Sequence, residues 1–160
     1  KLPVRPTTDF AKEALFNILN NYYYFDELSV LDLFAGTGNI SYEFASRGCP
    51  SLIAVDSHSG CVQFINKTAR ELDYPITVLK ADVYEYLKRT VQRFDVIFAD
   101  PPYELPIEKF TEIAELVFER DFLNENGTLI IEHSSRTDLS NLPHFVTSKK
   151  YGGCVFSMFE

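Results

Sequence analysis

The chain has 160 residues, of which 46% are hydrophobic, so it can bury one full core but is short for two ordinary domains. We therefore expect a single domain over residues 1–160. No apolar run approaches the ~20 residues that a membrane span needs, and the first residues lack the apolar stretch of a signal peptide. The sequence thus favours a cytoplasmic protein that does not enter a membrane. Because the chain begins at Lys1 and not at a methionine, we also expect that an N-terminal segment is missing from it.

The formal net charge of -8 argues against a protein that holds nucleic acid over a long surface, since such binding depends on neutralising phosphates. Basic residues nevertheless cluster locally, and an enzyme needs only a local region of positive potential. The three cysteines are odd in number, far apart and without a C-x-x-C pair. They indicate neither a disulfide framework nor a zinc site, and we expect no metal.

Short apolar runs alternate with helical stretches, which is typical of a parallel sheet covered on both faces. The first helix is expected to begin at Thr8 or Asp9. Its apolar stripe at helical spacing comprises Phe10, Ala11, Ala14, Leu15, Ile18, Leu19 and Tyr22. Further helices are predicted over residues 39–48, 60–72, 83–89 and 107–119, and strands over residues 29–34, 52–56, 76–79, 94–99 and 128–132. Asn126 and Gly127 predict a turn before the last of these strands.

The end of the chain follows a different pattern. Residues 145–149 and 155–159 flank Tyr151-Gly152-Gly153, which predicts an antiparallel hairpin. The expected fold is therefore α/β, with three Rossmann-like layers and a mostly parallel seven-stranded sheet that ends in this C-terminal hairpin.

A first candidate site lies where strand 29–34 gives way to helix 39–48, in the segment Asp-Leu-Phe-Ala-Gly-Thr-Gly of residues 32–38. Ligands of open α/β sheets bind beyond the carboxyl ends of the strands, and glycines let the backbone approach them closely. A dinucleotide-binding turn carries a third glycine or alanine where this chain has Ser41. That departure, together with Asp32, favours a ligand that bears an ammonium group over one that bears a pyrophosphate.

Two more carboxylates end the following strands. Asp56 lies about 20 residues after the glycines, where an acidic side chain can accept hydrogen bonds from both hydroxyls of a ribose. Asp82, which follows strand 76–79, could accept a hydrogen bond from an adenine amino group. Any one of these acids could instead belong to a surface loop or a helix cap, whereas three at successive strand ends favour a nucleoside ligand.

A second candidate site is Asp100-Pro101-Pro102-Tyr103, where strand 94–99 must stop because proline lacks the N–H of a strand ladder. An exocyclic amino group of a base is a poor nucleophile, since its lone pair is delocalised into the ring. The Asp100 carboxylate and the Pro101 carbonyl could accept hydrogen bonds from its two N–H groups. These bonds would favour a pyramidal nitrogen whose lone pair faces the electrophile. Tyr103 offers a ring on which an extruded base can stack. Taken alone, the tetrapeptide could also be a rigid turn.

In this order, three motifs resemble the class I methyltransferases and, more narrowly, the RsmD family. They are Arg5-Pro6-Thr7-Thr8-Asp9 followed by Glu13 and Leu15-Phe16-Asn17, the glycine segment 32–38, and Asp100-Pro101-Pro102-Tyr103. The similarity covers nearly the whole chain, including Gly152-Gly153 before the last strand. The family usually carries a further segment with glycine and arginine before the first motif, where this chain has only residues 1–4.

The resemblance implies the class I methyltransferase fold and methylation of guanine N2 in small-subunit ribosomal RNA, within a partly assembled subunit. It implies S-adenosylmethionine as the cofactor and S-adenosylhomocysteine as the product. The implied cofactor-binding residues are Asp32, Phe34, Ala35, Gly36, Gly38, Asp56, Asp82 and Val83. The implied catalytic residues are Asp100, Pro101, Pro102 and Tyr103, and the implied substrate-binding residues are Arg5, Thr7, Thr8 and Tyr103. We expect a monomer.

Several alternatives stay open. An adenine-N6 methyltransferase could use the same tetrapeptide, because both purines can carry an exocyclic amino group. Methyltransferases that act on protein glutamine resemble one another in carrying Asn where this chain has Asp100. A nicotinamide-dependent oxidoreductase is disfavoured by Ser41, and a non-catalytic RNA-binding module of the same fold is disfavoured by the intact motifs.

Overall fold

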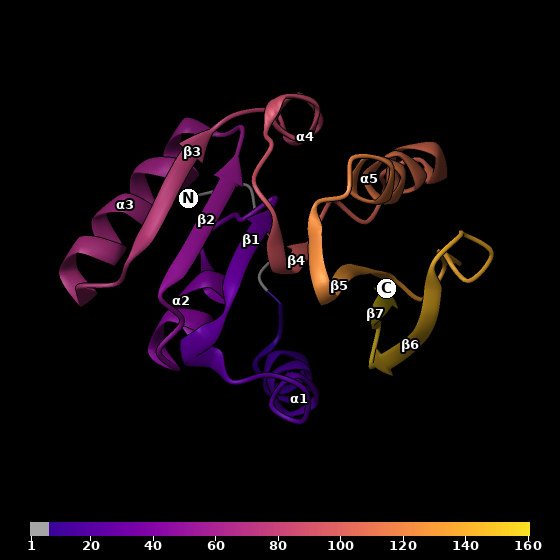
Figure 1. The fold of residues 1–160 in the computed structure, drawn as a ribbon, viewed down its shortest axis with the longest axis horizontal. Helices are drawn as coiled ribbons and strands as arrows, with labels where there is room; N and C mark the ends of the chain where they lie inside the picture. The colour runs from indigo at the N-terminus through magenta and orange to yellow at the C-terminus, as the bar shows by residue number, and fades with distance from the viewer. Residues whose placement is uncertain (1–6) are drawn as a thin grey trace.

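We describe residues 7–160 of the fold from a computed structural model. Within them, seven strands form one sheet in the order β3-β2-β1-β4-β5-β7-β6 (Figure 1). The strands are β1 (Ser29–Leu33), β2 (Ser51–Asp56), β3 (Ile76–Lys80), β4 (Phe94–Ala99), β5 (Leu123–Ser134), β6 (Phe145–Tyr151) and β7 (Cys154–Phe159). Strands β1 to β5 pair in parallel, whereas β7 pairs antiparallel with both β5 and β6. The predicted fold class is confirmed, including its C-terminal hairpin.

Helices cover both faces of this sheet (Figure 1). They are α1 (Asp9–Leu19), α2 (Asn39–Ser46), α3 (Ser59–Leu72), α4 (Val83–Arg89) and α5 (Ile107–Glu119), with a short 3₁₀ turn η1 (Phe25–Glu27) that was not predicted. Buried side chains of α1 and α2 pack on one face, which we call the α1 face, and those of α4 and α5 pack on the opposite face. Helix α3 lies beside α2, where Ile65 approaches Gly38.

The buried side of α1 differs in part from the predicted stripe. Ala11, Leu15 and Leu19 are buried as expected, but Phe10 is 70% exposed, and Tyr22, which lies beyond the end of the helix, is 76% exposed. Phe16, which was not assigned to the stripe, is fully buried between Phe25 and Phe44. The unpredicted 3₁₀ turn supplies Phe25, so the stripe is rotated toward a partner that the periodicity of α1 alone does not reveal.

Strand β5 corrects a second prediction. The sequence predicts a turn at Asn126-Gly127 and a strand over residues 128–132, whereas the observed strand is Leu123–Ser134. Leu123 pairs with Phe94 of β4, and Thr128 pairs with Val96. The longer spacing on β5 shows that the predicted turn is a bulge inside one strand. Asn126 has a φ of 65°, and a Cβ on Gly127 would lie 2.8 Å from the Asn124 carbonyl. The turn-forming residues were recognised correctly, but they bend a strand that then continues.

The other predicted strands and helices agree with the observed bounds within two residues. Among residues 7–160, no helix combines the length and the apolar character that crossing a membrane would require.

The burial of Phe16 gives a test of the packing of α1. Phe16→Ala should lower the free energy of unfolding by about 3–5 kcal/mol, because it leaves a cavity beside the rings of Phe25 and Phe44. Phe10→Ala on the same helix should change it by less than about 1 kcal/mol, since that ring is mostly in solvent. Urea denaturation of both variants makes the measurement, and equal destabilisation by the two would contradict the observed rotation of the helix.

Candidate active site

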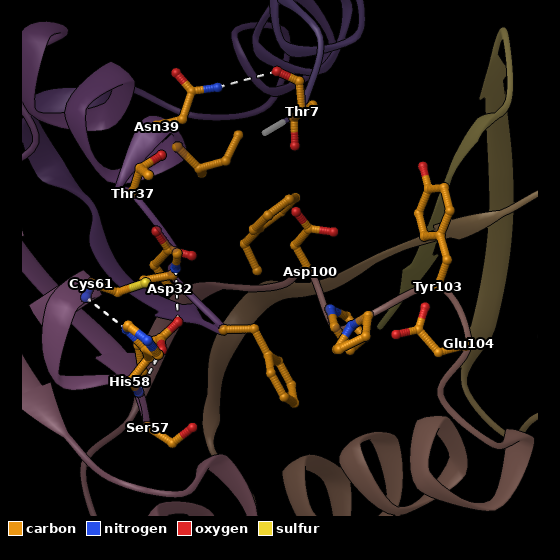
Figure 2. A pocket seen from close by; sticks show the side chains of 18 residues that line it. Thr7, Asp32, Thr37, Asn39, Ser57, His58, Cys61, Asp100, Tyr103 and Glu104 are labelled. Atoms are coloured by element: carbon orange, nitrogen blue, oxygen red, sulfur yellow. Dashed lines mark hydrogen bonds between the residues drawn. The ribbon is translucent and has the colours of Figure 1, made fainter. Parts of the chain in front are cut away.

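The two predicted turns lie at the same edge of the sheet and line one cavity of about 540 Å³. Strands β1, β2 and β4 are parallel neighbours, so their carboxyl ends meet at this edge. Residues of the glycine turn form one wall of the cavity, and Asp100, Pro101, Pro102 and Tyr103 form the facing wall (Figure 2). A volume of this size is typical of small-molecule sites. The structure thus brings together two segments that are more than 60 residues apart in the chain.

Left-handed backbone conformations shape the glycine turn. Phe34, Gly36 and Gly38 have φ values of 57°, 59° and 86°. The Ala35 N–H donates to the Val55 carbonyl at 3.0 Å, which ties the turn to the end of β2. The φ of Gly38 favours glycine, and a Cβ there would also lie 2.7 Å from the end of the Tyr42 ring, which would have to move. Phe34, Ala35 and Gly36 line the cavity, while Gly38 begins helix α2 behind them.

Asp32 is the most unusual group of the cavity wall, because its carboxylate is only 1% exposed. Ser41 donates from Oγ to Oδ2 at 2.7 Å, and Oδ1 has no hydrogen-bond partner within residues 7–160. Burial raises the pKa of Asp32 to about 7, while the Ser41 hydrogen bond opposes this shift and the charge of Asp56 adds to it. A buried acceptor without a partner can stabilise a ligand cation, so the residue fits the ammonium group that the sequence predicted.

Asp56 lies across the glycine turn at the end of β2. Its Oδ2 accepts from the Gly36 N–H at 2.8 Å, and its Oδ1 accepts from the His58 N–H at 2.9 Å. These bonds fix the orientation of the carboxylate at the cavity wall, and each oxygen keeps further acceptor capacity. The side chain can therefore accept hydrogen bonds from ligand hydroxyls, as predicted for a ribose.

The structure places Asp82 and Val83 differently. Asp82 is exposed and caps helix α4 by accepting from the Glu85 N–H at 3.0 Å. Val83 is buried in the core on the face of the sheet opposite the α1 face. Neither residue lines the cavity. Their contact with a cofactor remains a prediction, and the observed role of Asp82 is a helix cap.

The diproline turn begins where β4 ends. The Asp100 N–H donates to the Leu33 carbonyl at 3.3 Å, so the first residue of this turn is bonded to the last residue of β1. Tyr103 extends the wall toward the C-terminal hairpin (Figure 2). Burial raises the pKa of the Cys154 thiol to about 12, with further increases from Glu132 and Asp100, while a hydrogen bond with Tyr103 lowers it. Cys154 of β7 is therefore close to Tyr103.

The first motif reaches the cavity through Thr7. This side chain is buried, lines the cavity and donates from Oγ1 to Oε1 of the buried Glu132 at 2.5 Å. The Thr7 carbonyl accepts from Asn39 Nδ2 at 3.3 Å. Thr8 is exposed and accepts from the Ala11 N–H at 3.2 Å as the N-cap of α1, outside the cavity lining. Arg5, the other predicted contact, lies outside the described residues.

Several lining residues were missed from sequence. They include Asn39, Ile40, His58, Cys61 and Phe98. Position offered a signal for two of them, since Asn39 follows Gly38 directly and His58 follows Asp56 by two residues. His58 accepts from the Cys61 N–H at 3.2 Å and begins helix α3 at the cavity edge.

Comparison with solved structures shows the fold class. A hypothetical protein of Thermus thermophilus superposes with a TM-score of 0.86 at 24% identity, covering 100% of this chain and 91% of that one. A methyltransferase from Escherichia coli, titled "Putative methyltransferase yhhF", superposes with a TM-score of 0.84 at 22% identity, covering 99% and 89%. These two likenesses show the fold, a mostly parallel sheet with helices on both faces.

Sequence comparison gives the family. The model of the family described as "Conserved hypothetical protein 95" matches residues 2–160. "Putative rRNA methyltransferase YlbH" of Bacillus subtilis is 35% identical over 140 residues, which cover 84% of this chain and 74% of the relative. "Ribosomal RNA small subunit methyltransferase D" of Buchnera aphidicola is 29% identical over 133 residues, covering 82% and 66%. The chain belongs to this methyltransferase family, the RsmD family predicted from its motifs.

The raised pKa of Asp32 predicts a pH-dependent stability. An unfolded aspartate ionises near pH 3.8, whereas Asp32 in the fold ionises at about pH 7. Folding therefore loses stability as pH rises between these values, because the folded state binds the extra proton. Asp32→Asn, which does not titrate, should raise the Tm relative to the parent protein at pH 8 and much less at pH 5.

Thermal denaturation at both pH values makes this measurement. Ser41→Ala is the matched variant, because it removes the hydrogen bond that lowers the pKa of Asp32 and keeps the titrating group. It should retain the pH-dependent loss of stability. A Tm difference between Asp32→Asn and the parent that is the same at pH 5 and pH 8 would show that Asp32 does not titrate in this range.

Proposed function

We propose that the protein transfers a methyl group from S-adenosylmethionine to the exocyclic N2 of a guanine in small-subunit ribosomal RNA. The observation that carries this proposal is the cavity shared by the glycine turn and the Asp100–Tyr103 turn. The two relatives are named as ribosomal RNA methyltransferases, which supports the substrate class. A solved RNA methyltransferase from Salinibacter ruber with S-adenosylhomocysteine bound has the same fold, with a TM-score of 0.76 at 13% identity.

The residues of the glycine side fit the cofactor. Asp32 offers a buried acceptor to the ammonium of the methionyl part, and Asp56 offers fixed carboxylate oxygens to the ribose hydroxyls. The turn at Phe34, Ala35 and Gly36 lets the backbone approach the ligand closely. When bound, the cofactor supplies an electrophilic methyl group on a sulfonium.

The facing wall suits an aromatic amine. The Asp100 carboxylate and the Pro101 carbonyl would accept hydrogen bonds from the two N–H groups of the guanine amine. These bonds would direct the nitrogen lone pair toward the methyl group. Pro101 and Pro102 fix the backbone of this wall because their rings restrict φ. Tyr103 would stack on the extruded base. Asp100 need not be a strong base, because the nitrogen becomes acidic as it is alkylated.

The substrate is proposed to be rRNA in an assembling small ribosomal subunit, so the enzyme would act in the cytoplasm. One chain supplies both walls of the cavity, and a monomer therefore suffices. Adenine N6 is the second candidate acceptor, since the Asp100–Tyr103 geometry does not depend on which purine carries the amino group.

The identity of the methylated nucleoside tests this proposal. The protein is incubated with methyl-labelled S-adenosylmethionine and small ribosomal subunits from a strain that lacks the gene, and the RNA is then digested to nucleosides. We expect the label in N2-methylguanosine. Label in N6-methyladenosine would move the acceptor to adenine, and label in protein would overturn RNA as the substrate.

The role of Asp100 is tested with two variants. Asp100→Ala removes an acceptor from the amine and should lower kcat by about 10²–10³-fold. Asp100→Asn keeps one acceptor oxygen and should lose less. The Kd for S-adenosylhomocysteine, measured by calorimetry, should stay within about twofold for both, because Asp32 and Asp56 hold that ligand. Near-normal kcat in Asp100→Ala would contradict the assigned role.

A further inference from the structure

The tip of the C-terminal hairpin lies beside the cavity. Strand β7 runs antiparallel to β5 and begins at Cys154, opposite Ser134 at the carboxyl end of β5. The β6–β7 turn at Gly152-Gly153 therefore lies at the same edge of the sheet as the two cavity turns. Tyr151 is the last residue of β6 and pairs with Cys154, whose thiol hydrogen-bonds with Tyr103 of the cavity wall.

An exposed aromatic ring lies against this tip. Phe10, in the first turn of α1, contacts Tyr151 edge to face with ring centroids 5.8 Å apart, yet 70% of Phe10 remains exposed. Tyr151 is half-buried and packs on Phe156, with the two ring centroids 6.0 Å apart. The Phe10 ring is thus held at one edge, while most of its surface faces solvent.

Both partners of this contact are anchored to the cavity wall. Thr7, three residues before Phe10, lines the cavity and is bonded to Glu132. Tyr151 is connected to the wall through Cys154 and Tyr103. The Phe10–Tyr151 pair therefore forms a rim that continues the wall on which the target base would stack.

A cation completes this rim. Side chains alternate between the two faces of a strand, so Lys149 shares the α1 face of β6 with Tyr151, whereas Lys150 points to the opposite face. Lys149 is exposed, and no ion pair within residues 7–160 involves it. An ammonium on the same strand face as one ring of this aromatic pair suits a nucleotide, which presents a phosphate and a base together.

We propose that Phe10, Tyr151 and Lys149 bind the nucleotide next to the methylated one in single-stranded RNA, with Phe10 stacking on its base and Lys149 contacting its phosphate. This inference rests on the proposed function, since it assigns the rim to the same RNA whose target base enters the cavity. Stacking of a base on an aromatic ring tolerates any sequence, so the rim supplies affinity more than specificity.

Phe10→Ala tests the stacking contact. We expect the Kd for in vitro transcribed small-subunit rRNA to rise by about 10-fold, because one base–ring contact is lost. The kcat at saturating RNA and the Kd for S-adenosylhomocysteine should not change. Tyr22→Ala is the matched control, since Tyr22 is 76% exposed beyond the other end of α1 and should leave the RNA affinity unchanged.

Lys149→Gln tests the phosphate contact against Lys150→Gln. The first substitution should weaken RNA binding and reduce the slope of log K against log salt by about 1. The second removes the same charge from the opposite face and should have a clearly smaller effect. If the two substitutions weaken RNA binding equally, Lys149 makes no directed phosphate contact, and the loss reflects only the change in net charge.

The outcomes separate this inference from the function on which it rests. If the parent protein methylates rRNA and Phe10→Ala binds it as tightly as Tyr22→Ala does, the rim assignment alone is wrong. If the parent protein transfers no methyl group to RNA, the proposed function is wrong. Loss of binding to small subunits without loss of binding to naked rRNA would show that the rim faces a protein.

Discussion

One backbone hydrogen bond joins the two halves of the active site, from the Asp100 N–H to the Leu33 carbonyl. It extends the parallel register in which Leu33 of β1 lies beside Ala99 of β4. The glycine turn follows Leu33, and the diproline turn follows Ala99, so this register fixes the separation of cofactor and acceptor walls. A slip of one residue would turn the Asp100 side chain to the opposite face of the sheet. Sheet packing and the position of the reacting groups are therefore the same constraint, and the hydrophobic residues of β1 and β4 enforce it from both faces.

Asp32 shows that a residue of the site can lower the stability of the fold. A carboxylate that is 1% exposed, and one of whose oxygens has no hydrogen-bond partner in the described part of the chain, opposes folding once it is ionised. Ser41 offsets part of this penalty with a single hydrogen bond, and the third glycine of a dinucleotide-binding turn could not do so. The residue that separates this turn from the dinucleotide motif is thus the one that stabilises its buried acid. A cation in the cavity would supply the remaining interaction, so ligand binding and stability are linked through one side chain.

The sequence predicted the succession of strands and helices along the chain, because each of them carries its own periodicity and its own stop signal. It failed where a partner distant in sequence decides. Phe16 turns inward because Phe25 and Phe44 receive it, and Asn126-Gly127 bends β5 without ending it because β4 continues beside it. The same distinction holds for the site. Asp32, Asp56 and the Asp100–Tyr103 turn were recognisable because their chemistry is local to a strand end, whereas Phe98, an apolar residue inside β4, carries no such local signal. Asp82 also caps helix α4, a role that the sequence offers for any strand-end aspartate before a helix.

The acidic composition and the RNA substrate are compatible if contact is confined to one edge of the sheet. A net charge of -8 repels a polyanion from most of the surface, which disfavours binding in unproductive orientations. The cavity, Tyr103, Tyr151 and Phe10 lie together at the carboxyl edge, where aromatic surface needs no phosphate neutralisation to hold a base. An acidic protein that presents stacking surfaces at its active-site rim would favour unpaired nucleotides over a duplex, because a duplex offers its phosphates and hides its bases. The same physical preference selects a substrate whose target base can leave the stack.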